Sequence, residues 1–256
     1  MSSDTYQLFL YVMTAIGAMV FVALYFVKAG YGIFHTSSWG ISIPNKPAWI
    51  LMETPAFAIM LLCWLNHGIQ IGAPQSVFVL LFLLHYFQRS FIFPLLMKGR
   101  SRMPLLIVLM GAIFNTLNAW LLAEGMFYYP PVSLYPEGWN YWRQIFPWVG
   151  LLLFIAGMII NLHSDHVIRH LRKPGDTNHY LPDGGLYRYV TSANYFGELL
   201  EWTGFAVLTS LPAAWVFVWW TAANLVPRAN AIYKRYCEEF GEDAVGKRKR
   251  IIPFIY

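Results

Sequence analysis

The sequence has few charged residues and very few cysteines. Only 12% of its 256 residues are Asp, Glu, Lys or Arg, whereas soluble domains carry about 25%. The two cysteines, Cys63 and Cys237, are too few for a disulfide framework and lack the spacing of a zinc site. No basic region followed by a cleavage site opens the chain, so a secretory signal is not expected. The low charge points to lipid as the solvent.

Several common site motifs are also missing. The chain has no Gly-x-Gly-x-x-Gly, no P-loop and no Gly-x-Ser-x-Gly elbow, so any nucleotide site is of neither the Rossmann nor the Walker type. No His, Cys and Glu residues have metal-ligand spacing. His163, His166 and His170 lie beside arginines, and we expect no metal there.

Long apolar runs are abundant. Hydrophobic residues make up 57% of the chain, and they gather into runs suited to crossing about 30 Å of hydrocarbon. The composition predicts an all-α integral membrane protein with seven transmembrane helices, forming a single membrane domain of residues 1–256. The runs are Gln7–Val27, Ala48–Leu65, Val77–Met97, Pro104–Ala123, Ile145–Leu162, Tyr195–Thr209 and Ala213–Asn230.

The basic residues test this count of helices. With the N-terminus outside and strict alternation, 16 of the 18 Lys and Arg residues fall on one side of the membrane. The exceptions are Arg143, in an outer connection, and Arg89, inside a run. We therefore predict an outside N-terminus and a cytosolic C-terminus. Topology explains the net charge of +5, so no nucleic-acid partner is expected.

Glu53 is an ionisable residue within the second run. Such residues cost about 2.5–3.5 kcal/mol each on insertion scales, which makes them candidates for function. One explanation is a carboxylate paired with a neighbouring helix. The other is a buried acid with a raised pKa that donates a hydrogen bond while neutral.

The third and fourth runs carry further polar residues. His85 and Arg89 share one helix face, and Tyr86 points about 100° away from His85. We expect a structural ion pair for Arg89, whereas Tyr86 is either a core tyrosine or a functional one. Asn115 and Asn118 share a face of the fourth run, where hydrogen bonds between helices explain them.

The segment from Asn161 to Glu201 joins two polar helix ends through a basic loop that begins at Arg169. Polar residues recur in each helix end at helical spacing, so each set forms one stripe. A salt-bridged helix pair is one explanation, but a bound polar ligand explains the cluster better. The stripes are Asn161, Asp165 and Arg172, and Asn194, Glu198 and Glu201.

Basic residues on the predicted inner side suit an anionic ligand that carries phosphates. Topology alone also places arginines there, so each one taken singly is weak evidence. The residues are Lys98, Arg100, Arg102, Arg169, Arg172, Arg228 and Arg235.

Several segments resemble the steroid 5α-reductase family (3-oxo-5α-steroid 4-dehydrogenases), of which this chain could be a bacterial member. They occur in family order and spacing over nearly the whole chain beyond the first run. They are Ala48-Trp49…Glu53-Thr54-Pro55, His85-Tyr86-Phe87-Gln88-Arg89, Asn161-Leu162-His163-Ser164-Asp165, Leu171-Arg172-Lys173-Pro174-Gly175, Gly184-Gly185-Leu186, Ser192-Ala193-Asn194-Tyr195-Phe196-Gly197-Glu198 and Ile252-Pro253-Phe254-Ile255-Tyr256.

The resemblance implies a seven-helix membrane reductase that takes NADPH from the cytosolic side and a steroid from the bilayer. Glu53 and Tyr86 would hold the substrate 3-ketone, in a pocket mainly from helices 1–4. The NADPH site would come mainly from residues 98–102 and 161–236. Its predicted contacts are Trp49, Lys98, Arg100, Asn161, Asp165, Arg172, Asn194, Glu198, Arg228 and Tyr236.

The chain departs from the vertebrate pattern in four places. Met52 stands where Gln usually precedes the acid, and Met110 stands where a basic residue approaches the steroid. His179-Tyr180 replaces Tyr-Arg, and Asn230-Ala231-Ile232 replaces a histidine-rich run.

The expected reaction is reduction of the C4–C5 double bond of a 4-ene-3-ketosteroid such as testosterone or progesterone. Two other functions stay open at this point. A related membrane enzyme could act on another sterol, a polyprenol or an enoyl thioester, or transfer a methyl group from S-adenosylmethionine. A non-catalytic lipid-binding or transport protein is the second. The sequence favours neither a bacterial inner membrane nor the endoplasmic reticulum.

Overall fold

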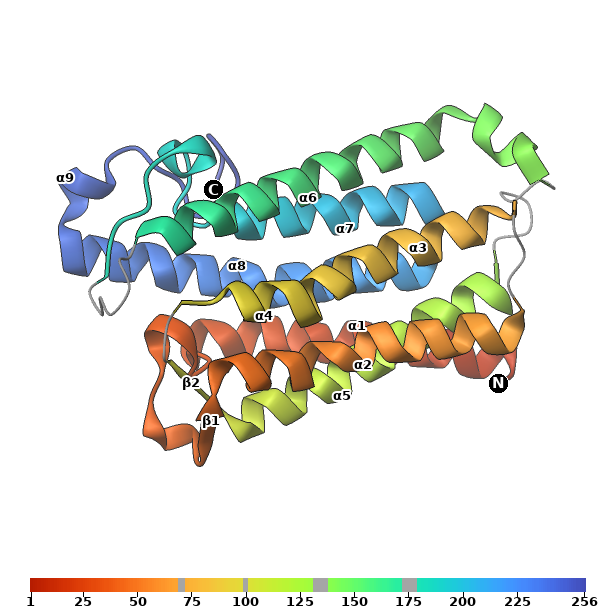
Figure 1. The fold of residues 1–256 in the computed structure, drawn as a ribbon, viewed down its shortest axis with the longest axis horizontal. Helices are drawn as coiled ribbons and strands as arrows, with labels where there is room; N and C mark the ends of the chain where they lie inside the picture. Colours follow the sequence, from red (N-terminus) through yellow and green to blue (C-terminus); the bar gives the residue numbers. More distant parts are fainter. Residues whose placement is uncertain (69–71, 99–100, 131–137, 172–178) are drawn as a thin grey trace.

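Long helices running along one axis make up most of the structure, a computed structural model (Figure 1). It describes residues 1–68, 72–98, 101–130, 138–171 and 179–256. The helices are α1 Ser3–Phe26, α2 Asn45–His67, α3 Pro74–Phe87, α4 Phe93–Leu96, α5 Leu105–Phe127, α6 Ile145–Leu171, α7 Ala193–Thr209, α8 Pro212–Phe240 and α9 Glu242–Val245. Short 3₁₀ helices η1 Gly32–Phe34, η2 Ser37–Trp39, η4 Gly138–Arg143 and η5 Gly185–Arg188 lie between them, and η3 Gln88–Ile92 is a π-helix.

Five helical segments are long and apolar enough to cross a membrane, which fits a multi-pass membrane protein. Helix α7 is not among them because it has only 17 residues. Helix α8 is apolar at its start but carries four charged residues from Lys234 to Glu239 in its last turns. Seven crossings therefore remain a prediction. The five segments are Ser3–Phe26, Asn45–His67, Pro74–Leu96, Leu105–Phe127 and Ile145–Leu171.

The third apolar run is not one regular α-helix. Its centre is η3, in which the Phe93 N–H donates to the Gln88 carbonyl five residues back. The cause lies at Pro94, which has no N–H to give to the Ser90 carbonyl. Wider turns of this kind are often found at functional sites.

Four predicted helix ends fall short of the observed ones, and the largest differences are in α6 and α8. Helix α6 continues past Leu162 to Leu171, so Arg169 belongs to its last turn and not to a loop. Basic residues stabilise a helix C-terminus because they interact favourably with its dipole. Helix α8 likewise continues past Asn230 to Phe240, ten residues beyond the apolar run, because its polar continuation retains a helical pattern.

A small sheet was not expected in an all-α fold. Strand β1 (Ser42–Pro44) pairs antiparallel with β2 (Arg102–Pro104), and Ile43 lies opposite Met103. Each strand directly precedes a helix, α2 or α5. The sheet therefore fixes the starting points of these two helices relative to each other.

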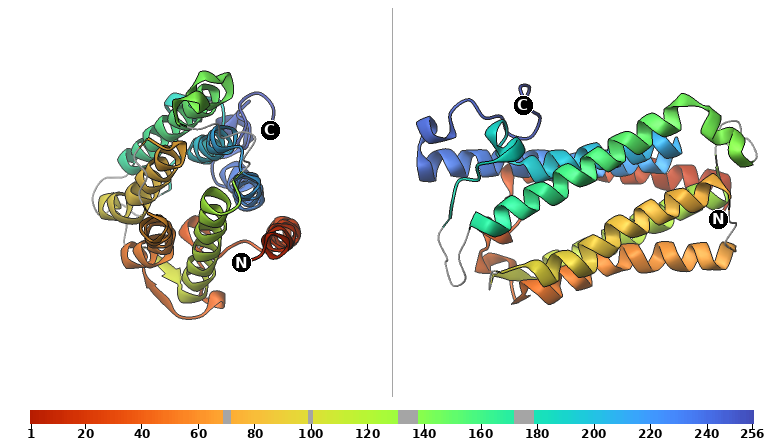
Figure 2. Two further views of the ribbon diagram at one scale, coloured as in Figure 1. Left: turned by 90° about the vertical axis from the view of Figure 1, so that its right-hand side faces the viewer. Right: turned by 45° about the horizontal axis from the view of Figure 1, so that its top comes forward.

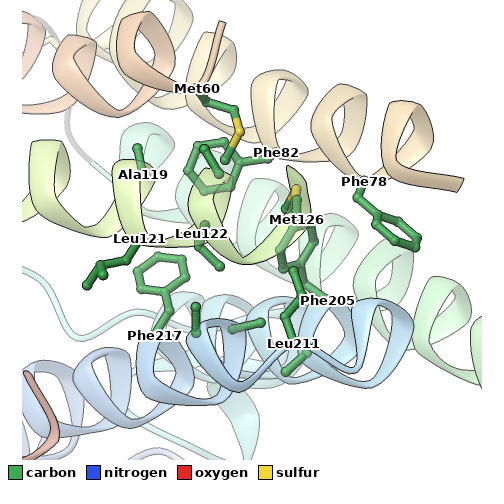
Figure 3. Packing of buried hydrophobic residues seen from close by; sticks show 14 of the residues in the cluster. Met60, Phe78, Phe82, Ala119, Leu121, Leu122, Met126, Phe205, Leu211 and Phe217 are labelled. Atoms are coloured by element: carbon green, nitrogen blue, oxygen red, sulfur yellow. The ribbon is translucent and has the colours of Figure 1, made fainter. Parts of the chain in front are cut away.

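The main core lies among α1, α2, α3, α5, α7 and α8. Aromatic and aliphatic side chains from these helices interdigitate there (Figure 3). Trp202 of α7 is almost completely buried, with its ring centroid 4.5 Å from that of Phe217 on α8. Between helices that cross a bilayer, such side chains stabilise the fold through van der Waals packing rather than through removal from water.

Helices α6 and α7 pack with their backbones in contact. A Cβ atom added to Gly157 would lie 2.3 Å from the Glu201 backbone nitrogen, and one added to Gly204 would lie 2.3 Å from the Phe154 nitrogen. Gly150 and Gly197 lie as close to the partner helix. These glycines permit an approach that any side chain would block. The two polar stripes are thereby held side by side.

The connections that carry most basic residues gather at one end of the bundle. The segment after α1, the β1–β2 sheet, residues 179–184 before η5 and the C-terminal segment lie at this end, opposite the N-terminus (Figure 1). Viewed along the bundle, α1 lies near α8 on one side, and α2 and α3 lie on the other (Figure 2). Residues distant in sequence can therefore face one interior space.

Candidate functional site

A cavity of about 990 Å³ occupies the interior at the basic end of the bundle. Ordinary ligand pockets measure about 300–1,000 Å³, so this one is large. Its lining comes from α1, α2, α3, α5, α6, α7 and α8 and from the segment after α1. Nine of the predicted site residues line it: Trp49, Glu53, Tyr86, Lys98, Asp165, Asn194, Glu198, Arg228 and Tyr236.

Three predicted residues do not appear in that lining. Asn161 is buried behind it, where its amide donates to the Asn194 backbone carbonyl at 2.9 Å. It therefore joins α6 to α7. Arg100 and Arg172 lie outside the described residues.

Glu53 and Tyr86 meet through a third residue, Asn115 of α5. The Asn115 amide nitrogen donates to Glu53 Oε2 at 3.1 Å and to the Met52 carbonyl at 2.8 Å. The Tyr86 hydroxyl donates to Asn115 Oδ1 at 3.4 Å. A carboxyl group and a phenol thus lie side by side on the cavity surface, linked by one amide.

Arg89 is the centre of a charged network across three helices. Its guanidinium lies 3.2 Å from Asp165 Oδ2 and 3.6 Å from Glu198 Oε2. Its carbon Cζ lies 5.0 Å from the ring centroid of Trp49 and 4.4 Å from that of Phe93. The two carboxylates and two aromatic rings compensate a cation that is only 8% exposed. The ion pair expected for Arg89 is confirmed.

A hydrogen-bonded chain links Asp165, Asn194 and Tyr187. Asn194 donates to Asp165 Oδ1 at 3.4 Å and accepts from the Tyr187 hydroxyl at 3.3 Å. Tyr187 lies in η5, and its burial raises the pKa of its phenol well above the usual range. Tyr187 therefore stays protonated and donates at any working pH.

His85 is adjacent in sequence to Tyr86 and has its own acidic partner. Its Nδ1 lies 2.8 Å from Glu201 Oε1, and both residues are buried. The His85 ring packs edge-on against Trp202, 4.5 Å away between centroids. This pair places a titratable ring on the cavity surface.

Arg228 anchors the segment after α1. It donates from Nε to the Tyr195 hydroxyl at 3.0 Å and from Nη2 to the Tyr31 carbonyl at 3.0 Å. It also stacks on the Tyr31 ring, with 3.7 Å between Cζ and the centroid. Much of its donor capacity is therefore used within the protein.

A second set of residues that line the cavity is apolar. We call it the apolar wall, formed by Met13, Ile16, Val20, Leu24, Met110, Ile113, Phe114, Phe217 and Trp220. The polar wall comprises Glu53, His85, Tyr86, Arg89, Asp165, Asn194 and Glu198. One cavity therefore offers an apolar face to one reactant and hydrogen-bonding groups to another.

Sequence reasoning missed the roles of two residues. Asn115 was predicted to form hydrogen bonds between helices, and this prediction is confirmed. Its link to both Glu53 and Tyr86 was not predicted. His85 was placed on the face of Arg89 without a partner. Its position inside an apolar run was the sequence feature that could have indicated a role for His85. Among the residues that the structure describes, no three His, Cys, Asp or Glu side chains are grouped to hold a metal.

Comparison with known proteins identifies the family. The profile described as 3-oxo-5-alpha-steroid 4-dehydrogenase matches residues 101–256, more than half of the chain. The chain is 37% identical to 3-oxo-5-alpha-steroid 4-dehydrogenase 1 of Bos taurus over 249 residues, 96% of this chain and 95% of the relative. It is 40% identical to 3-oxo-5-alpha-steroid 4-dehydrogenase 2 of Homo sapiens over 250 residues, 95% of this chain and 94% of the relative.

A plant relative extends the same result. The chain is 36% identical to Steroid 5-alpha-reductase DET2 of Gossypium hirsutum over 240 residues, 92% of this chain and 91% of the relative. The chain therefore belongs to the 3-oxo-5-alpha-steroid 4-dehydrogenase family and is an oxidoreductase that reduces steroids. A non-catalytic transport protein is excluded by this membership.

Proposed function

We propose that this protein uses NADPH to reduce the C4–C5 double bond of 4-ene-3-ketosteroids, of the testosterone and progesterone type, to 5α-dihydrosteroids. The observation that carries the proposal is the Glu53–Asn115–Tyr86 group, which lines the same cavity as the apolar wall. A ketone oxygen there can meet two donors, while the hydrocarbon rings lie against the apolar wall.

The donor set of the cavity fits NADPH. Trp49, Asn194 and Glu198 offer an aromatic face, an amide and a carboxylate. Lys98 and Arg169 line the basic end, where they suit phosphates. When bound, NADPH would supply the hydride that is added at C5. The cofactor contacts proposed are Trp49, Lys98, Arg100, Asn161, Asp165, Arg172, Asn194, Glu198, Arg228 and Tyr236, with Asn161 acting through Asn194.

Glu53 and Tyr86 act on the 3-ketone. Addition of hydride at C5 moves negative charge onto the ketone oxygen. The Tyr86 hydroxyl and the neutral Glu53 carboxyl donate hydrogen bonds to that oxygen and stabilise the developing enolate. The buried site excludes water and thereby strengthens both hydrogen bonds. Protonation at C4 completes the reduction.

The topology is part of the proposal. Seven crossings with the N-terminus outside place the basic end of the bundle in the cytosol. NADPH then enters from the cytosol and the steroid enters from the bilayer. Helices α7 and α8 complete the count beyond the five segments that meet the length and composition criteria.

The direct test measures NADPH oxidation by the purified protein with testosterone or progesterone. We expect the 5α-dihydro product. Glu53→Leu and Tyr86→Phe each remove one donor and should each lower kcat by about 10²–10³, the usual cost of one lost donor at a developing oxyanion. Full turnover in either variant would refute the assigned role.

Two controls separate the alternatives. Glu198→Ala should lose NADPH binding while its melting temperature shows a folded protein, which supports the cofactor side. A binding comparison of NADPH with S-adenosylmethionine tests methyl transfer. A panel of sterol, polyprenol and enoyl substrates tests the other lipids. Tight binding of S-adenosylmethionine without NADPH oxidation would overturn the proposal.

A further inference from the structure

Asn115 is placed to control both proposed catalytic side chains, yet it belongs to neither of their helices. It lies on α5 and is buried, whereas Glu53 is on α2 and Tyr86 is on α3. The approach of α5 to α2 is close, because a Cβ added to Gly111 would lie 2.5 Å from Met52 Cγ. Gly111 is one turn before Asn115, so this contact brings the amide within reach of Glu53.

The chemistry of its partners fixes the orientation of the Asn115 amide. The Met52 carbonyl can only accept a hydrogen bond, and it lies 2.8 Å from Nδ2. Nδ2 must therefore face α2, where its second hydrogen points to Glu53 Oε2 at 3.1 Å. The oxygen Oδ1 is left to face Tyr86. Reversal of the amide would set two carbonyl oxygens against each other.

This orientation decides where a proton on Glu53 must be. Oε2 accepts from Asn115, so in the neutral acid the proton resides on Oε1. Both amide hydrogens are then in use, one on Met52 and one on Glu53. The acid is left with a single donor whose direction is set by Asn115.

The same amide also engages Tyr86 before a ketone arrives. The phenol has one hydrogen, and it points to Asn115 Oδ1 across 3.4 Å. This distance is long for a hydroxyl donor, whose hydrogen bonds centre near 2.7–2.8 Å. A ketone oxygen that approaches more closely can replace the amide as acceptor at little cost.

We propose that Asn115 is a positioning residue for the reaction. It confines the Glu53 proton to Oε1 and holds the Tyr86 hydroxyl until the substrate ketone takes its place. The inference rests on the proposed function, since it assumes that Glu53 and Tyr86 meet a ketone.

A variant series on Asn115 tests the inference. Asn115→Ala removes every contact, and Asn115→Asp keeps an acceptor for Tyr86 while losing the donors to Glu53 and Met52. We expect a fall in kcat of about 10–100-fold in Asn115→Ala, the scale of effect that small misplacements have. NADPH affinity, measured by its fluorescence, should stay within about twofold, because Asn115 is not among the proposed cofactor contacts.

Asn118 is the matched control. It lies one turn further along α5 and is buried to the same extent, and its amide nitrogen has no hydrogen-bond partner among the described residues. Asn118→Ala should leave kcat within about threefold. An equal loss of kcat in Asn118→Ala and Asn115→Ala would mean that either change merely loosens α5.

Double variants separate positioning from stability. If Asn115 acts through Glu53 and Tyr86, its replacement should cost at least about fivefold less in the Glu53→Leu or Tyr86→Phe background. If replacing Asn115 lowered kcat by the same factor in the unchanged protein and in both variant backgrounds, the inference would be overturned. Such a result would leave the proposed function standing, because the single variants of Glu53 and Tyr86 test that separately.

A binding measurement needs no turnover. A saturated 3-ketosteroid and its 3-deoxy analogue are titrated against the cofactor-free protein by tryptophan fluorescence. Asn115→Ala should reduce the preference for the ketone about tenfold and leave the 3-deoxy affinity unchanged. An unchanged or larger preference for the ketone would overturn the inference, even if the protein reduced some other lipid.

Discussion

The polar atoms of the two cavity walls have different hydrogen-bond partners. On the polar wall, side chains bind one another across helices, as Arg89 does with Asp165 and Glu198. At Trp220 of the apolar wall and at the neighbouring Thr221, the polar side-chain atoms instead donate hydrogen bonds to backbone carbonyls. Thr221 donates to the Phe217 carbonyl of its own helix at 2.9 Å, and the Trp220 indole donates to the Met13 carbonyl at 2.8 Å.

The difference shows how one cavity can serve two unlike reactants. Polar side chains held by other side chains keep a fixed geometry and retain lone pairs for a ligand. Polar atoms satisfied by backbone present hydrocarbon to the cavity and do not compete with a lipid-like ligand. If this comparison is right, changes in the network of Arg89, Asp165 and Glu198 should alter stability and cofactor binding. Changes on the apolar wall should alter steroid binding without altering cofactor binding.

The largest effect is expected at Arg89. Arg89→Leu removes the cation and leaves the buried Asp165 and the half-buried Glu198 without the guanidinium that compensates their charge. Breaking a buried pair in this way costs about 3–5 kcal/mol. The free energy of unfolding, measured by denaturation in detergent, should fall by that amount.

A surface pair provides the control for Arg89→Leu. Arg235 lies 3.1 Å from Glu239 on the more exposed end of α8, and such pairs contribute about 0.2–1 kcal/mol. Arg235→Ala should therefore lower the free energy of unfolding by less than about 1 kcal/mol. Equal losses in the two variants would show that the polar wall is not a charged network.

Sequence reasoning predicted the helices well because their signal is local. Apolar runs located the seven long helical segments found in the described part of the chain. The π-turn at η3 depends on how Pro94 disturbs one hydrogen bond, and the β1–β2 pairing joins segments about 60 residues apart. Neither follows from hydrophobic periodicity.

The site was predictable where spacing alone set the geometry. Asp165 and Glu198 were each placed on a stripe, and the structure brings these stripes together at Arg89. The Asn115 link could not be predicted, because it depends on the register between α2 and α5, which Gly111 and Met52 set by their contact. Such registers depend on tertiary packing, so the sequence pattern of a single helix does not determine them.

An intermediate effect is expected on the apolar wall. Phe114 packs 4.8 Å from Trp220 between ring centroids and lines the cavity. Phe114→Ala removes apolar surface worth about 1–3 kcal/mol to a bound hydrocarbon, so the steroid KM should rise roughly tenfold while the Kd for NADPH stays constant. Glu198→Ala should show the reverse pattern. A change in both constants in both variants would mean that the walls do not divide the reactants.

The smallest effect is expected at Thr221, and it tests the comparison most finely. Thr221 lines the cavity, but its hydroxyl donates to the Phe217 carbonyl of its own helix. Thr221→Val keeps the shape and removes only a group that we regard as hidden from the ligand, so the steroid KM should change by less than about twofold and stability by about 0.5 kcal/mol or less. Thr221→Ser, which keeps the hydroxyl, is the matched control. If Thr221→Val alone changed the preference between a 17-hydroxy steroid and its 17-deoxy analogue more than fivefold, the hydroxyl would reach the ligand. The apolar wall would then contain a recognition group.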